Sequence, residues 1–254
     1  MRFGLIGLVL LLLSREIVVS LTSITLLIAP LARLAETRDD ASGSKAEGMR
    51  AWRKGHHDAA MRMLMPFAED GDPAAQNAIG EMLIAGRLDA KGSRPAWATR
   101  NDVEATVWFR KAAFQGFPRA QVNLGFMLEK TGRIPAKKEA ARWYRCAAEQ
   151  GFAAGQHHLA RHFETGDGMP RDLAKAVFWY VKAMNQNFAA SQYAFGRLRR
   201  DGIGLSRNTA EALRLFRLAA NQGIEEAQEA LSELFAAATS RKTSGRTAGP
   251  GRAY

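Results

Sequence analysis

Pairs of bulky apolar residues recur along this chain at an almost constant interval, and this period limits the fold more than any other feature of the sequence. The pairs are Trp108-Phe109, Trp143-Tyr144, Trp179-Tyr180 and Leu215-Phe216, spaced 35, 36 and 36 residues apart. A Gln-Gly pair keeps the same interval at Gln115-Gly116, Gln150-Gly151 and Gln222-Gly223, with Gln186-Asn187 in its place once. Such a period is typical of repeat arrays, in which each unit buries its apolar face only against its neighbours.

Each unit is predicted to be a pair of helices. Apolar residues stand at i, i+3, i+4 and i+7 in every second helix, as in Ala140, Trp143, Tyr144 and Ala147, which gives one stripe along a helix. The predicted first helices cover 74–86, 118–130, 153–164 and 189–200, the second helices cover 102–115, 136–150, 172–186 and 208–222, and a last helix covers 225–238. Asn101, Asp172 and Asn208 stand where their side-chain oxygens would cap the second helices, whereas Ala136 takes that place in one unit.

The run LARHFETGDGMPRDLAKAVFWYVKAM, from Leu159 to Met184, resembles the Sel-one-like repeat, a relative of the tetratricopeptide repeat. The resemblance is strongest over residues 120–223. It implies an all-α fold, a right-handed superhelical solenoid of antiparallel helix pairs, and a role as an adaptor for other proteins. Some secreted members of that family pair cysteines in every repeat, but this chain has only Cys146.

Composition divides the rest of the chain. We expect an apolar targeting or membrane segment at 1–35, a linker at 36–48, the solenoid at 49–238 and a disordered basic tail at 239–254. The solenoid comprises about four repeats, a degenerate first unit and a capping helix. The net charge is +11, but the tail carries four basic residues and no acid, so the repeats are only mildly basic. This balance does not predict nucleic-acid binding.

The N-terminal segment holds two apolar runs, 3–13 and 17–32, separated by Arg15-Glu16. Joined, they are long enough to span a membrane, with two central charges that cost about 2.5–3.5 kcal/mol each. Alternatively, 17–28 is the apolar stretch of a signal peptide that ends at Ala32, or the start codon is misassigned. We expect export, to the periplasm or to a membrane-anchored place in the cell envelope, with a buried helix of a cytoplasmic protein as the alternative.

Three histidines form the only cluster with metal-ligand spacing: His157, His158 and His162. His162 falls at the position of Met82, Met127 and Leu198, which predicts a buried side chain. The sequence shows no nucleophilic serine motif, phosphate loop or pair of catalytic acids. We therefore expect no enzyme and no cofactor or metal. The alternative is an enzyme or metal-binding subunit that uses the histidines or an insertion at 87–100, which contains Trp97.

The resemblance to tetratricopeptide proteins implies a groove lined by the first helix of each repeat. Its register selects six candidate partner-binding residues: Phe126, His157, Arg161, Tyr193, Arg197 and Arg200. Because arginine forks suit carboxylates, the expected ligand is an acidic or extended segment of another protein. The predicted function is a non-catalytic protein–protein interaction adaptor or scaffold of a bacterial-type cell envelope. The alternative for this face is a solvated surface that binds nothing.

Overall fold

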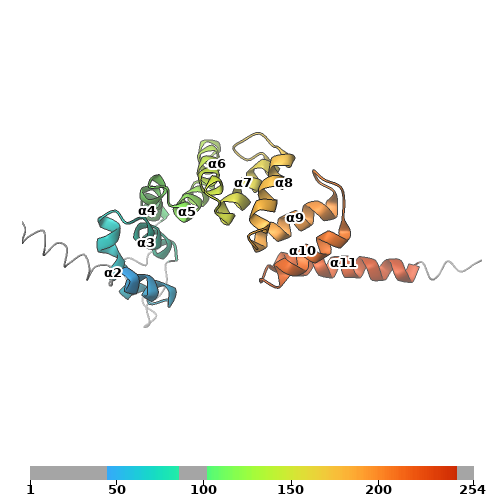
Figure 1. Ribbon diagram of the computed structural model, residues 1–254, viewed down its shortest axis with the longest axis horizontal. Helices are drawn as coiled ribbons and strands as arrows, with labels where there is room; N and C mark the ends of the chain where they lie inside the picture. The colour runs from blue at the N-terminus through green and yellow to red at the C-terminus, as the bar shows by residue number, and fades with distance from the viewer. Residues whose placement is uncertain (1–44, 86–101, 245–254) are drawn as a thin grey trace, which may run out of the picture. The chain divides into compact units, whose positions relative to one another are not determined.

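The computed structural model describes residues 45–85 and 102–244, and the regular structure of these residues is helical (Figure 1). The chain divides into two compact units, residues 1–67 and 68–254. The first unit contains a helix over 45–53 and most of α2 (His57–Glu69). A Cβ atom on Gly48 would lie 2.8 Å from Cγ of Leu64, so glycine is needed where these two helices approach. The first of them begins inside the range predicted as a linker, because Lys45, Ala46 and Glu47 favour helix.

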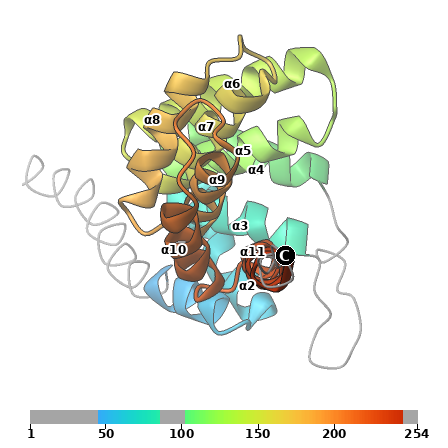
Figure 2. The ribbon, with the colours of Figure 1, turned by 90° about the vertical axis from the view of Figure 1, so that its right-hand side faces the viewer.

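The second unit is an array of helices, each packed against the next in chain order, as the colours from cyan to red follow in Figure 1. The first helices of the repeats are α3 (Pro73–Ala85), α5 (Pro118–Glu129), α7 (Ala153–Thr165) and α9 (Ala189–Asp201). The second helices are α4 (Asp102–Phe114), α6 (Ile134–Glu149), α8 (Leu173–Met184) and α10 (Thr209–Ala220). The last helix, α11 (Glu225–Ser244), packs against α10 and is seen end-on in Figure 2. The predicted all-α fold of sequential helix pairs is confirmed.

The recurring aromatic residues fill the space between paired helices. Phe109, Tyr144, Tyr180 and Phe216 are buried, and each lies one position after the Trp or Leu of its pair. Small residues on the first helices make room for the rings: a Cβ on Gly125 would lie 2.6 Å from Cε1 of Tyr144. These rings are buried between the two helices of a repeat, and Tyr144 also contacts His158 and His162 of the next helix, α7.

The turns follow the sequence prediction with one correction. Asp172 and Asn208 cap α8 and α10 through bonds of 3.0 Å from the backbone N–H groups of Lys175 and Glu211. Asn187 adopts φ 61°, the left-handed conformation that glycine takes at the other repeat ends. The prediction that α6 starts after Ala136 was wrong. This helix begins at Ile134, because Pro135 is compatible with a first turn.

Three predicted segments lie wholly or largely outside the described residues: the targeting segment at 1–35, the insertion at 87–100 with Trp97, and the tail beyond 244. The predicted tail from 239 overlaps the end of α11, which continues to Ser244. Among the described residues, no helix has the length and apolar content that crossing a membrane requires.

Candidate functional site

The six predicted partner-binding residues lie on three first helices: Phe126 on α5, His157 and Arg161 on α7, and Tyr193, Arg197 and Arg200 on α9. We call the exposed side of α3, α5, α7, α9 and α11 the first-helix face. Phe126 is 48% exposed, and the other five are partly buried. In the described part of the chain, no hydrogen bond, ion pair or ring contact joins any two of the six. They are therefore spread along a face and do not form one cluster.

Beneath this face, an acid, a tyrosine and an arginine from three consecutive helices meet. Glu129 ends α5, and its carboxylate accepts a bond of 2.8 Å from the hydroxyl of Tyr144 on α6. Nη2 of Arg161 on α7 donates to both carboxylate oxygens at 2.7 and 2.6 Å. The glutamate side chain is only 17% exposed, whereas the arginine side chain is 43% exposed. We call this set of three positions a rung, since it joins two repeats.

The next pair of repeats contains a second rung with the same chemistry. The hydroxyl of Tyr180 donates to Glu164 Oε2 at 2.8 Å, and Nη2 of Arg197 donates to Glu164 Oε1. Burial raises the pKa of the Tyr180 hydroxyl, so it stays a donor. The sequence analysis missed this pairing. The signal for it was that a Glu, a Tyr and an Arg stand at equivalent positions in both repeats. One edge of each predicted ligand-binding arginine is therefore already occupied by an internal carboxylate.

The two outer rungs differ. At the C-terminal rung, between α9 and α11, the charges are reversed. Arg200 stands in the place of the acid and Glu233 in the place of the arginine, 3.7 Å apart. Phe216 replaces the tyrosine, and the Arg200 guanidinium lies 5.9 Å from its ring centre. Arg200 also pairs with the neighbouring Asp201, at 2.8 Å. At the first rung all three positions are apolar: Ile84, Phe109 and Phe126.

His162 is a fourth member of the first charged rung. It is fully buried, its Nε2 lies 2.8 Å from Glu129 Oε1, and its Nδ1 lies 2.6 Å from the backbone oxygen of Asp167. Burial alone would raise the pKa of Glu129, but hydrogen bonds from His162 and Tyr144 and the charge of Arg161 outweigh it and lower this pKa to about 2. Both ring nitrogens of His162 therefore face an oxygen atom of the protein. The predicted burial of His162 is confirmed.

The other two histidines belong to the packing between α7 and its neighbours. His158 stacks on Tyr144 at 4.7 Å, and Nδ1 of His157 lies 3.0 Å from the Ser191 hydroxyl. Burial, followed by the charge of neighbouring cations, lowers the pKa of His157 to about 3 and that of His158 to about 4. Within residues 45–85 and 102–244, no group of three or more His, Cys, Asp or Glu side chains could hold a metal ion. The nitrogens of His162 are both engaged by the protein, so the three histidines do not converge on a common point.

The Gln-Gly pairs have a structural role that the sequence analysis did not identify. Nε2 of the repeat-closing Gln186 donates to Oε1 of Gln156 at 2.8 Å and to the backbone oxygen of Gly151 at 2.9 Å. Gln156 is buried and donates in turn to the backbone oxygen of Ala148. The same amide pair occurs in the other repeats, as Gln115 with Gln76, Gln150 with Gln121, and Gln222 with Gln192. The glutamine therefore joins the end of each repeat to its own first helix.

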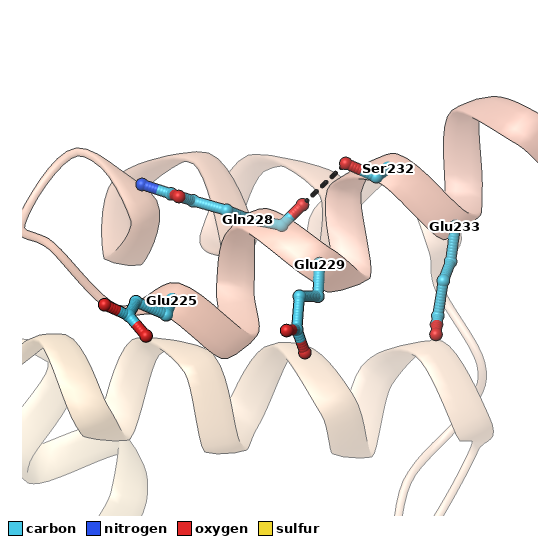
Figure 3. Close-up of a pocket in the computed structure, with 5 residues that line it drawn as sticks. All are labelled: Glu225, Gln228, Glu229, Ser232 and Glu233. Atoms are coloured by element: carbon cyan, nitrogen blue, oxygen red, sulfur yellow. Dashed lines mark hydrogen bonds between the residues drawn. The ribbon is translucent and has the colours of Figure 1, made fainter.

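The first-helix face changes charge at α11. Glu225, Glu229 and Glu233 point to one edge of the exposed face of α11 (Figure 3). Gln228 and Ser232 lie beside them on the same face, joined by a bond of 3.0 Å from the serine hydroxyl to the glutamine backbone oxygen. These five residues line a pocket of about 590 Å³. Glu229 continues the register of His157 and Tyr193. The face is thus basic at α7 and α9 and acidic at α11.

The comparisons with known proteins agree with this architecture. The family model of the Sel1 repeat matches residues 73–117, 118–152, 153–188 and 189–224. The crystal structure of a Sel1 repeat protein from Oxalobacter formigenes is similar, with 29% identity and a TM-score of 0.57 over 74% of each chain. A protective antigen of uropathogenic Escherichia coli with an SLR fold is also similar, with 29% identity and a TM-score of 0.62 over 81% of this chain. Only 44% of that antigen is covered. No curated protein matches this chain.

Proposed function

This chain belongs to the Sel1 repeat family, and on that premise we propose that it is a non-catalytic adaptor of the cell envelope that holds a segment of a partner protein on its first-helix face. One observation carries the proposal. Arg161 and Arg197 are each fixed by a carboxylate that is more buried than the arginine itself, which leaves the other edge of the guanidinium at the surface.

The remaining edges of these arginines suit a carboxylate or a backbone carbonyl. A guanidinium has five N–H donors in a rigid plane. The bonds to Glu129 and Glu164 use Nη2, and within the described residues Nε and Nη1 of Arg161 and Arg197 make no hydrogen bond. The internal pair also holds each fork in one orientation, which lowers the entropy that binding would cost.

The neighbouring side chains indicate the kind of segment that would bind. Phe126 on α5 and Tyr193 on α9 place apolar surface on either side of Arg161 along the array. Farther along, Glu229 and Glu233 would repel an acidic chain and attract a basic one. We therefore expect an extended segment whose acidic part lies over α7 and α9 and whose basic part lies over α11.

The proposed location in the cell envelope is based on the N-terminal segment. Its apolar runs at 3–13 and 17–32 suit export or membrane attachment. Fractionation of the native cells with sequencing of the mature N-terminus tests this part. Recovery of the intact chain from the cytosol would refute it.

The test of the face uses arginine-to-lysine substitution, because lysine keeps the charge but loses the fork. A photocrosslinking amino acid placed at Tyr193 captures the partner in the native cell. We expect one discrete adduct, reduced at least fivefold by the double substitution Arg161→Lys and Arg197→Lys.

Two controls test whether the crosslink depends on the first-helix face and whether the double variant is still folded. A crosslinker at the exposed Arg142 of α6 should not give the adduct. The double variant should also keep the thermal midpoint of the unsubstituted chain within roughly 4 °C, because each lysine can still pair with its glutamate. An adduct that is unchanged in the double variant would contradict the proposal.

A further inference from the structure

The second helices α4 and α6 belong to successive repeats, and side chains from both helices fill the space between them. Glu139 accepts a bond of 3.1 Å from Arg110 Nη1 and lies 3.4 Å from the indole nitrogen of Trp143. Phe114 meets the same indole edge-on, with ring centres 5.2 Å apart. A carboxylate and an aromatic ring, from two different helices, therefore cover this tryptophan.

The boundary between α8 and α10 is closed in another way. Glu211 stands in the place of Glu139, and its Oε2 lies 2.7 Å from Nε of Arg199 on α9. Leu215 replaces the tryptophan and is fully packed, with 1% of its surface exposed. Here too a carboxylate from the second helix is paired within the protein.

The boundary between α6 and α8 lacks both closing groups. Lys175 replaces the carboxylate of Glu139, and Glu149 replaces the ring of Phe114. Arg145, in the place of Arg110, therefore has a cation where its partner would be. Trp179 likewise receives no ring from α6. The result is a cavity of about 440 Å³ that these four side chains help to line.

The cavity has an apolar floor and a cationic rim. Phe163 of α7 is buried beneath it, and Lys175 lies over that ring at 5.5 Å. Arg145, Arg171 and Lys175 supply three positive charges, against the two negative charges of Glu149 and Asp172. Asp172 and Lys175 pair with each other at 2.8 Å, and Asp172 also caps α8, so the remaining charges are those of Arg145 and Arg171 against Glu149. The rim therefore favours an anion next to an apolar group.

We propose that this cavity binds a segment of a partner protein in which a phenylalanine stands beside an acidic residue. The phenyl ring takes the place against Trp179 that Phe114 takes against Trp143. The carboxylate pairs with Arg145, as Glu139 pairs with Arg110, and lies beside Lys175. The site lies between second helices, apart from the first-helix face, and it holds a second contact with whatever the adaptor binds.

The experiment uses the whole chain and the peptide fluorescein-Gly-Ser-Gly-Asp-Phe-Gly-Ser-amide. Polarisation should give a saturable binding curve. In the nitrogen–proton NMR spectrum of the five tryptophan indoles, the signal that Trp179→Phe removes should shift most. Versions of the peptide with Asn for Asp, or Ala for Phe, should bind at least fivefold more weakly.

The matched variants are Lys175→Glu and Arg214→Glu, which change the charge of the chain equally. Glutamate at 175 recreates the arrangement of Glu139 with Arg110 and places an acid three residues after the Asp172 cap, so this variant should fold. We expect Lys175→Glu to weaken the affinity for the peptide at least tenfold. Arg214→Glu, on the exposed side of α10, should change this affinity less than twofold. Equal binding to both variants, or no shift of the Trp179 indole, would overturn the proposal.

Discussion

Replacing Glu129 by alanine tests whether the rungs hold the repeats together. The substitution removes the acceptor of the Tyr144 hydroxyl, of His162 and of Arg161 at once. A buried hydroxyl left without a partner costs about 1–3 kcal/mol. The half-exposed arginine adds at most about 1 kcal/mol. The fully buried His162 ring also loses its partner, which brings the total loss to about 3–5 kcal/mol in the free energy of unfolding.

The matched control is Glu139→Ala, since Glu139 is also a glutamate between repeats but pairs with Arg110 at a half-exposed site. Such a pair contributes about 0–1 kcal/mol. Thermal unfolding followed by circular dichroism should show a midpoint roughly 10 °C lower for Glu129→Ala and a nearly unchanged one for Glu139→Ala. Equal midpoints for the two variants would refute the inference that the buried rung matters more than the surface pair.

Three further predictions concern other contacts, and thermal unfolding checks each of them. Gln156→Ala should cost about 1–3 kcal/mol, because its buried amide both donates and accepts in the repeat-closing pair. Exchanging the charges, as Arg200→Glu with Glu233→Arg, should restore part of the stability that Arg200→Glu alone loses, because the pair with Asp201 stays broken. A double-mutant cycle without coupling would count against a reversed rung. The unfolded chain protonates His157 and His158 near pH 6.5, whereas their folded pKa values are lowered to about 3 and 4, so stability should fall as the pH drops from about 6.5 to 4. Replacing both histidines by phenylalanine should flatten that dependence, and an unchanged slope would be the contrary result.

The repeats, the fold and several local features could be predicted from sequence because they depend on residues close together in the chain. The aromatic stripe has the period of a helix, and an Asp or Asn at a helix start has one local donor to accept from. The burial of His162 also followed from register alone. In each case the neighbouring repeat supplied the same environment, so one unit could be interpreted from another.

The candidate site was predictable in position but not in pairing. The register placed Arg161 on the first-helix face, yet its partner Glu129 belongs to the previous repeat and reaches it only when α5 and α7 pack at a particular offset. Gln156 was overlooked because a glutamine is usually a surface residue. Its burial depends on the amide of Gln186 from the far end of the same repeat.

The order of the repeats is constrained by the rungs, and deleting whole repeats tests this. Removing residues 153–188 would bring Arg197 to the position of Arg161, opposite Glu129 and Tyr144, so an intact rung would form. Removing residues 189–224 would bring Glu233 opposite Glu164, and two carboxylates would meet at a largely buried junction. In a repeat array each deletion removes one unit and one interface, so the intrinsic losses are similar.

The difference in thermal midpoint between the two deletions should therefore come from the charges that meet at the new junction. Burying an uncompensated charge costs about 3–5 kcal/mol, which predicts a clearly lower thermal midpoint for the deletion of 189–224. Adding Glu233→Arg to that deletion should recover the midpoint, because it completes a rung with Glu164 and Tyr180. If the deletion of 189–224 melts at or above the deletion of 153–188, then charge matching at the rungs does not decide which repeats can be neighbours.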